Sequence, residues 1–237
     1  MIEKRGGSFP STLVIVAALN EEEGVGPTLA EIKGSLDKPF CLVVDGRSTD
    51  GTAKIAEQMG AKVVTQKGSG KGDAIATAIA HAQTIEAEYV AFIDADYTYP
   101  AGYLPQMIKI LKANRNVGMV CGNRFNGRFH LGSMHTMLYL GNRFLAFTHN
   151  SLNSVHLQDP LTGLRVAKWR QLVKDWKPRS KGFDVEVELN QYVEKKGYSI
   201  VEIPISYRKR LGEKKLKLRH GFTILNRILT ERIQHYY

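Results

Sequence analysis

The sequence has few cysteines and no long hydrophobic run. Only 2 cysteines occur in 237 residues, and Cys41 and Cys121 both lie in apolar stretches typical of buried, reduced thiols. Two cysteines cannot staple a chain of this length, so a disulfide-rich secreted fold is excluded. No apolar stretch reaches the ~18 residues that a membrane-spanning helix needs, and residues 1–10 lack the apolar core of a signal peptide. We therefore expect a cytoplasmic protein.

Acidic residues are outnumbered by basic ones. The chain has 33 Lys and Arg against 23 Asp and Glu, which gives a formal net charge of +10. A hydrophobic content of 43% supports a sizeable core and excludes global disorder. The basic charge favours an anionic partner, which can be nucleic acid, anionic lipid or a phosphorylated substrate. Nucleic-acid binding would need interleaved stacking aromatics or a known module, and neither is found, so we expect no nucleic-acid partner.

The first half of the chain alternates between short apolar runs and helical patterns. Buried strands are predicted at Leu13–Ala17, Cys41–Val44, Lys62–Val64, Tyr89–Ile93 and Met119–Cys121. Helices are predicted at Pro27–Leu36, Thr52–Met59, Asp73–Ala82 and Leu104–Lys112. This alternation predicts an α/β fold, with a mostly parallel sheet and helices on both faces. Such sheets bind ligands at the carboxyl ends of their strands.

The pattern loosens in the second half. Helices are predicted at Met134–Phe147, Phe183–Lys196 and Phe222–Ile233, and strands at Gly163–Ala167 and Tyr198–Ile205. Between Tyr207 and His220 lysine and arginine dominate, which predicts a mobile basic loop. We therefore divide the chain into a tail (1–10), one α/β domain (11–205), and a basic loop with an amphipathic helix (206–237). The apolar face of that helix is formed by Phe222, Ile224, Leu225, Ile228 and Leu229.

The strongest chemical signal is the pair Asp94 and Asp96, at the end of a strand of small and apolar residues. Two carboxylates at this spacing repel each other unless a cation lies between them. Mg²⁺ or Mn²⁺ fits, because these hard ions are held by one or two carboxylates together with substrate phosphates. An isolated pair of this kind is more often solvated in a turn, but the position at a strand end favours a metal site.

Two more acidic segments follow predicted strands. Asp45 leaves a strand and can accept hydrogen bonds from a ribose or a base, whereas helix capping is sufficient to explain Asp50. Glu21 follows the first strand, and the helix dipole explains Glu22 and Glu23 without a function. Because these segments share one edge of the predicted sheet, together they indicate a ligand site there.

A glycine-rich loop spans Gly68–Asp73 but matches neither a Walker A loop nor the Rossmann spacing. Its Lys71 and free backbone N–H groups can meet an anion. His130 and His135 have metal-like spacing, but no cysteine pair accompanies them, so we interpret them as exposed or structural.

Taken in order, these motifs resemble the GT-A-type glycosyltransferases, specifically the dolichyl- or polyprenyl-phosphate mannose or glucose synthases of family 2. The segments that carry the resemblance are Ala17–Glu22, Val44–Thr52, Gly70–Ala74, Asp94–Asp96, Gly122–Phe125, Asp159–Gly163 and Tyr207–Leu216. The chain departs from the family pattern at Ala17 in place of proline, at Gly46-Arg47 in place of a second acidic residue, and at Lys214 in place of serine.

The resemblance implies an inverting transfer of mannose or glucose from GDP-mannose or UDP-glucose to dolichyl or polyprenyl phosphate, giving a β-linked product. It implies Mg²⁺ or Mn²⁺ at Asp94 and Asp96. The donor-binding residues that it implies are Ala17, Leu19, Glu21, Asp45, Lys71, Asp73, Asp94 and Ala95. The implied catalytic residues are Asp96, Arg124, Arg208 and Lys215, and the implied acceptor-phosphate ligands are Arg124, Arg143, Arg208, Arg210 and Lys215.

The acceptor chemistry favours cations over a general base. A phosphomonoester has a second pKa of about 6, so it is largely dianionic near neutral pH and needs positioning more than deprotonation. We expect the basic loop to close over the phosphates, and the last helix to hold the protein peripherally at an anionic membrane surface on the cytosolic side. Two alternatives stay open: a GT-A transferase with a soluble phosphorylated or sugar acceptor, and a non-catalytic basic module for membrane or nucleic acid.

Overall fold

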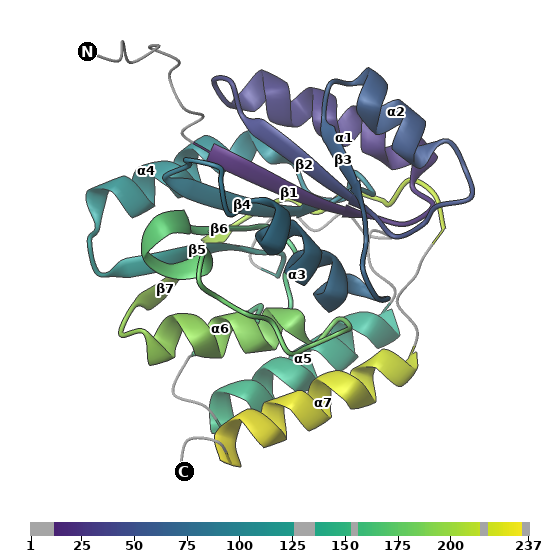
Figure 1. Ribbon diagram of the computed structural model, residues 1–237. Helices are drawn as coiled ribbons and strands as arrows, with labels where there is room; N and C mark the ends of the chain where they lie inside the picture. Colours follow the sequence, from purple (N-terminus) through teal and green to yellow (C-terminus); the bar gives the residue numbers. More distant parts are fainter. Residues whose placement is uncertain (1–11, 126–135, 153–155, 214–217, 234–237) are drawn as a thin grey trace, which may run out of the picture.

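A seven-stranded sheet forms the centre of the computed structural model, which describes residues 12–125, 136–152, 156–213 and 218–233 (Figure 1). The strands are β1 (Thr12–Ala18), β2 (Phe40–Asp45), β3 (Lys62–Thr65), β4 (Tyr89–Asp94), β5 (Val117–Asn123), β6 (Arg165–Lys168) and β7 (Ser199–Pro204). Their order across the sheet is β3-β2-β1-β4-β6-β5-β7. Only β6 runs antiparallel to its neighbours, so the predicted mostly parallel α/β sheet is confirmed.

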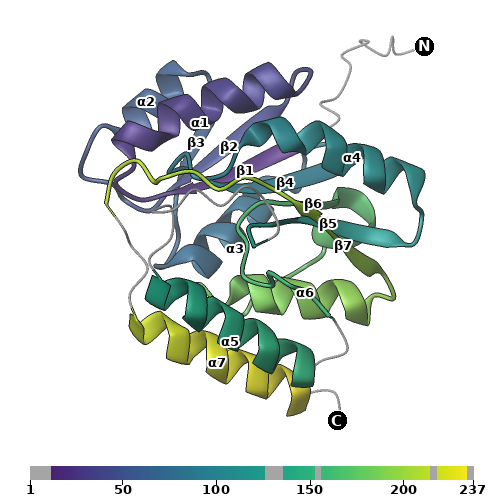
Figure 2. The same cartoon turned by 180° about the vertical axis from the view of Figure 1, so that it is seen from behind.

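Helices cover both faces of the sheet, as predicted (Figures 1 and 2). One face carries α1 (Glu22–Ser35), α2 (Thr52–Gln58) and α4 (Leu104–Ala113), and the other carries α3 (Lys71–His81) and α6 (Val185–Lys195). Two further helices, α5 (Thr136–Leu152) and α7 (Leu218–Ile233), lie side by side next to α6. Short helical turns occur at Ala101–Tyr103 and Trp169–Val173.

The central strands β1, β2 and β4 are mostly apolar because both faces of the sheet are buried there. In β1, Val14 and Val16 pack on the α1 side, whereas Leu13 and Ile15 pack on the α3 side. All four side chains are at most 1% exposed. Parallel register then brings the ends of neighbouring strands to one edge, where Ala17 pairs with Asp94 and Ala18 with Asp45. This edge is where the sequence predicts a ligand site.

Both cysteines match the prediction of buried, free thiols. Burial raises the pKa of Cys41 to about 11 and that of Cys121 to about 12, so neither is a nucleophile at neutral pH. Among the helices of the described residues, none is long and apolar enough to cross a membrane.

The predicted starts of the first and last helices are wrong, and so is the fully free apolar face predicted for the last helix. The first helix begins at Glu22, so Pro27 lies inside α1 and not in its first turn. The last helix begins at Leu218, and its Ile224 and Ile228 are buried against α5 and α6 and are not free to face a membrane.

The described part of the basic segment after β7 is hydrogen-bonded to the domain. The prediction of a mobile loop is therefore wrong for this part of the chain. The backbone N–H of Arg208 donates to the carbonyl of Thr98 at 3.0 Å, and that of Leu211 donates to the carbonyl of Asp96 at 3.1 Å. These bonds tie residues 207–211 to the turn that follows β4. The rest of the predicted loop, residues 214–217, lies outside the described residues.

Gly24 gives a test of how tightly α1 presses on that turn. A Cβ atom at Gly24 would lie 2.5 Å from the Ala95 carbonyl oxygen and 2.8 Å from Cα of Asp96, both of which are backbone atoms. We expect Gly24→Ala to lower the free energy of unfolding by about 1–3 kcal/mol, because the helix must move away from the sheet edge. Gly34, in the same helix, has nothing within 4 Å of such a Cβ.

The matched control is therefore Gly34→Ala, which should raise the free energy of unfolding by about 0.4–1 kcal/mol through the lost entropy of the unfolded chain. Urea unfolding of both variants measures the difference. Equal effects of the two substitutions would contradict the close contact between α1 and residues 95–96.

Candidate active site

A cavity of about 650 Å³ lies at the carboxyl edge of β1 and β4. Its walls come from both ends of the chain: the residues after β1, the end of β4, the first turns of α3 and α6, the segment 207–210, and α7. Of the predicted donor-binding residues, those that line it are Ala17, Leu19, Glu21, Lys71, Asp94 and Ala95. Of the predicted metal, catalytic and acceptor residues, Asp94, Asp96, Arg124 and Arg210 line it.

Asp94 shares a lysine with a second carboxylate. Nζ of Lys71, the first residue of α3, lies 2.6 Å from Oδ1 of Asp94 and 2.7 Å from Oε1 of Glu186. Burial alone would lower the pKa of Lys71, but the charges of Asp94 and Glu186 outweigh it and hold that pKa above its ordinary value. Lys71 is therefore a fixed cation of the cavity wall.

Asp96 is held between a turn and an arginine. Its Oδ1 accepts hydrogen bonds from the backbone N–H of Thr98 at 3.1 Å and from the Thr98 hydroxyl at 2.6 Å. Its Oδ2 lies 2.7 Å from Nη1 of Arg210, whose Nη2 contacts Oε1 of Glu21. Burial and the charge of Asp94 raise the pKa of Asp96, and Arg210 and Thr98 oppose that shift. The carboxylate thus sits where a positive partner stabilises it strongly.

The oxygen ligands of this edge fit a divalent ion. Asp94 and Asp96 line the same cavity, and a Cβ at Gly163 would lie 2.5 Å from Oδ2 of Asp94, so only glycine leaves room for that carboxylate. The described residues contain no group of three or more His, Cys, Asp or Glu side chains that could hold a metal. An ion here would have to take its remaining ligands from a bound diphosphate and water, as Mg²⁺ commonly does.

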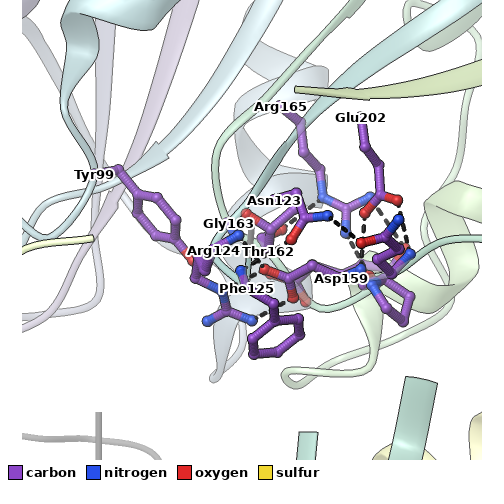
Figure 3. Close-up of polar contacts among 12 residues, drawn as sticks. Tyr99, Asn123, Arg124, Phe125, Asp159, Thr162, Gly163, Arg165 and Glu202 are labelled. Atoms are coloured by element: carbon purple, nitrogen blue, oxygen red, sulfur yellow. Dashed lines mark hydrogen bonds and ion pairs between the residues drawn. The ribbon is translucent and has the colours of Figure 1, made fainter. Parts of the chain in front are cut away.

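Arg124 is anchored by a buried ion pair (Figure 3). Its Nε and Nη2 lie 2.7 and 2.6 Å from the two carboxylate oxygens of Asp159, and its backbone N–H donates to Oδ2 at 3.0 Å. Glu202 of β7 in turn accepts the backbone N–H of Asp159 at 2.7 Å. Asp159 is fully buried and Arg124 is 6% exposed. The guanidinium therefore has a fixed position in the cavity wall, set by two distant segments.

Two tyrosines support the same wall. The hydroxyl of Tyr99 accepts the backbone N–H of Gly163 at 2.7 Å, and its ring meets that of Tyr207 edge-on at 5.2 Å between centroids. The guanidinium of Arg124 lies 5.4 Å from the centroid of Tyr207. Burial raises the pKa of Tyr99 well above its ordinary value, so Tyr99 stays neutral and serves as a hydrogen-bonding support.

Two predicted donor-binding residues, Asp45 and Asp73, do not line the cavity. The carboxylate of Asp45 accepts the backbone N–H of Ser48 at 3.1 Å, which closes the turn after β2. That of Asp73 accepts the backbone N–H of Ser69 at 2.8 Å, which closes the loop before α3. Both aspartates are used to satisfy backbone donors of their own turns.

Two of the predicted phosphate-binding cations, Arg208 and Arg143, also do not line the cavity. Arg208 forms two hydrogen bonds to Glu31 of α1, at 2.7 and 2.9 Å, and stacks on Tyr97, so it points away from the cavity. Arg143 is exposed on α5 and lies over the ring of Phe125. Lys215, like His130 and His135, lies outside the described residues.

The sequence did not single out Glu186 or Gln66, which both line the cavity. Glu186 is 6% exposed and pairs with Lys71, whereas Gln66 is 7% exposed and donates from Nε2 to the Gly70 carbonyl at 2.7 Å. An acid in the first turn of a helix is explained by the helix dipole, and a glutamine after a strand belongs to no motif. Only the packing of α6 and β3 brings them to the cavity.

Comparison with known proteins gives one family and several relatives. Residues 13–168 match the family model described as "Glycosyl transferase family 2". "Dolichyl-phosphate hexose transferase" of Haloferax volcanii is 32% identical over 212 residues, which cover 88% of each chain. "Glycosyltransferase AglJ" of the same organism is 33% identical over 199 residues, which cover 83% of this chain but only 63% of that relative.

Solved structures share the fold at lower identity. Glucosyl-3-phosphoglycerate synthase from Mycobacterium tuberculosis in complex with UDP superposes with a TM-score of 0.70 at 20% identity, over 94% of this chain and 80% of that one. The same enzyme in complex with Mn²⁺, UDP-glucose and phosphoglyceric acid gives a TM-score of 0.70 at 22% identity, with the same coverage. This likeness confirms the GT-A architecture that the motifs imply.

The Arg124–Asp159 pair can be tested as an anchor. We expect Asp159→Ala to lower the free energy of unfolding by about 3–5 kcal/mol, because Arg124 would keep a buried charge without its partner. The control is Glu86→Ala, which removes the carboxylate from a surface pair with Arg170 whose side chains are 39% and 54% exposed. That variant should lose less than about 1 kcal/mol. Urea unfolding separates the two, and similar losses would contradict the anchoring role.

Proposed function

The chain belongs to glycosyl transferase family 2, and we propose that it transfers a hexose, mannose or glucose, from a nucleotide-diphosphate sugar to a polyprenyl phosphate such as dolichyl phosphate. The single observation that carries the proposal is the composition of the 650 Å³ cavity, in which the carboxylates Asp94 and Asp96 face the cations Lys71, Arg124 and Arg210. Carboxylates for a metal and cations for phosphates are what a diphosphate donor and a phosphate acceptor require together.

The donor is proposed to bind along the carboxyl edge of the sheet. Ala17, Leu19 and Glu21 would contact the nucleoside, and Lys71 with Ala95 the diphosphate and sugar. Asp94 and Asp96 are the proposed ligands of Mg²⁺ or Mn²⁺, which when bound would neutralise the charge that develops on the leaving diphosphate. Lys71 supports the same charge, because its pKa is held above its ordinary value by the surrounding carboxylates.

The acceptor phosphate needs cationic side chains that orient it, and it needs no essential general base. A phosphomonoester oxygen is already an anion at neutral pH, so it can attack the anomeric carbon from the face opposite the leaving diphosphate, with inversion to a β-linked product. Arg124 is the proposed ligand of the acceptor phosphate, because its guanidinium is held in position by Asp159 while it lines the cavity. Arg210 is the second proposed ligand.

The relative named "Dolichyl-phosphate hexose transferase" favours a lipid phosphate as acceptor, since its 32% identity spans 88% of both chains. The rival acceptor is a small phosphorylated molecule, suggested by the complexes of glucosyl-3-phosphoglycerate synthase with phosphoglyceric acid. Those structures are 20–22% identical to this chain and share its fold. Membership of a glycosyltransferase family argues against the non-catalytic alternative.

An exposed apolar face of α5 supports the lipid acceptor. Leu140, Phe144 and Phe147 are 61%, 59% and 71% exposed, and they recur with the spacing of one helix face. Arg143, also exposed, lies on that face. Apolar side chains next to a cation are typical of helices that lie at an anionic membrane surface. We propose that this face, together with the exposed Phe222 and Leu229 of α7, holds the protein peripherally at the cytosolic side of the membrane.

A donor panel tests the activity. GDP-mannose and UDP-glucose are each incubated with the protein, Mn²⁺ and a short polyprenyl phosphate, and the lipid-linked sugar is measured. We expect turnover with one donor, and a loss of about 10²-fold or more for Asp94→Asn or Asp96→Asn, because the leaving charge is no longer neutralised. The control is Asp37→Asn, an exposed aspartate in the turn after α1, which should keep the wild-type rate.

Turnover with 3-phosphoglycerate and none with the lipid phosphate would overturn the acceptor assignment in favour of the rival. Full activity of Asp94→Asn would overturn the metal assignment while leaving the donor and acceptor as measured.

Vesicle binding tests the membrane-facing surface. We expect the double variant Phe144→Ser with Phe147→Ser to have an affinity for anionic vesicles at least about tenfold lower than that of the wild type. Two large apolar side chains would no longer enter the membrane interface. The control is Lys109→Ser on α4, across the sheet, which should bind like the wild type. Co-sedimentation with anionic and with neutral vesicles at low salt gives both values, and equal binding of the double variant and the wild type would contradict the proposal.

A further inference from the structure

We propose that Arg210 is an internal substitute for the divalent ion: its guanidinium occupies the cation position at Asp96, which it joins to Glu21, and the metal must displace it from Asp96 to bind. The inference rests on the proposed metal site and adds a competitor to it. It assigns to Arg210 a role in metal binding in addition to the proposed role toward the acceptor phosphate.

The contacts of Arg210 are those expected of a bridging cation. Nη1 lies 2.7 Å from Oδ2 of Asp96, and Nη2 contacts Oε1 of Glu21. Both carboxylate side chains are 7% exposed, and that of Arg210 is 24% exposed. Two nearly buried carboxylates on different elements, one after β1 and one after β4, are thus brought together by one guanidinium. A planar guanidinium can serve two acceptors at once, which a single ammonium group does less well.

Oδ2 of Asp96, which contacts Arg210, is also the oxygen that a metal would use. Oδ1 of Asp96 already accepts two hydrogen bonds from Thr98, through its backbone N–H and its hydroxyl. Oδ2 is therefore the oxygen left for a ligand on the cavity side, and it is the oxygen that faces Arg210. A divalent ion at coordination distance from Oδ2 and a guanidinium at hydrogen-bond distance from it would be like charges within a few ångströms in a partly buried site, which is strongly unfavourable. The two cations exclude each other.

Arg210 is held less completely than the other cations of the cavity. Its Nε is buried without a hydrogen-bond partner among the described residues. Arg124, by contrast, uses Nε and Nη2 on both oxygens of one carboxylate and is 7% exposed at its side chain. Lys71 is 13% exposed and lies between two carboxylates. Of these three cations, Arg210 is the one with the most exposed side chain, so it is the one that can leave.

The exchange of Arg210 for the metal links metal binding to anion binding. While Arg210 covers Asp96, the apparent affinity for the metal is reduced by the fraction of molecules in which the carboxylate is uncovered. Once the metal has replaced it at Asp96, the guanidinium has lost that acceptor and is available to an anion that enters the cavity. Metal binding and anion capture are therefore coupled through one side chain.

Binding of Mn²⁺ alone, without nucleotide or acceptor, tests the exchange. Free Mn²⁺ is measured by electron paramagnetic resonance during titration of the wild type, Arg210→Gln and Lys209→Gln. We expect Arg210→Gln to bind Mn²⁺ about tenfold more tightly, as follows if Arg210 covers the site in about 90% of molecules. Lys209 is exposed and adjacent in sequence, so Lys209→Gln removes the same charge from the same segment without uncovering Asp96, and it should bind within about twofold of the wild type.

A thermal melt gives a second readout and guards against a poorly folded variant. Without its guanidinium, Arg210→Gln leaves two buried carboxylates unbalanced, so it should melt at a lower temperature than the wild type. Mn²⁺ should then raise its melting temperature by more than it raises that of the wild type, in which one cation only replaces another.

The results separate this inference from the proposed function. If the wild type binds Mn²⁺ and Arg210→Gln binds it equally or more weakly, the exchange is overturned while the metal site stands. If Lys209→Gln gains as much affinity as Arg210→Gln, the effect is one of general charge and the exchange is likewise overturned. If neither the wild type nor Arg210→Gln binds Mn²⁺, the metal assignment and the exchange that rests on it are both overturned, and the donor panel still decides the transfer activity.

Discussion

The pairing of carboxylates with internal cations at the end of β4 is the interaction on which the rest of the site depends. Asp94, Asp96, Glu21 and Glu186 meet in one cavity wall, and so many partly buried negative charges are unstable without positive ones. Lys71 and Arg210 supply those charges. Each joins two carboxylates that are far apart in the sequence, so the first turn of α3, the first turn of α6 and the segment after β7 all converge on the same edge of the sheet.

A buried carboxylate is also balanced by a cation in the pair of Arg124 and Asp159, but here, among the described residues, the two form an ion pair only with each other. Arg124 and Asp159 satisfy each other, and Glu202 accepts the backbone N–H of Asp159, so this pair is closed and rigid. Such a pair contributes little net stability, because the cost of removing both charges from water offsets their attraction. The pair instead fixes the position of a guanidinium in the cavity wall. The cavity therefore combines one anchored cation, Arg124, with two cations, Lys71 and Arg210, that each bridge two carboxylates.

The geometry also fits the proposed transfer from a soluble donor to a lipid acceptor. His220 and Ile224 of α7 and Asn142 of α5 line the cavity, while exposed apolar side chains of the same two helices lie on their outer surface. A helix pair that is both a wall of the cavity and a proposed membrane-facing surface would bring the proposed lipid phosphate to the cations without a long path. The buried Ile224 and Ile228 pack α7 against the domain, so the proposed membrane-facing residues lie on a packed element.

The sequence by itself determined the α/β class, the strands and helices, and the acidic strand ends, because apolar periodicity and the residues that end a strand are local properties. It also indicated Asp94, Asp96, Lys71 and Arg124 through motifs. It could not determine which cations reach the cavity, because Arg208 and Arg210 are alike in sequence and only the position of Glu31 on α1 turns Arg208 away. Nor could it find Glu186 and Gln66, or the use of Asp45 and Asp73 in closing turns. Those outcomes depend on which elements lie next to each other, and distance along the chain does not encode that.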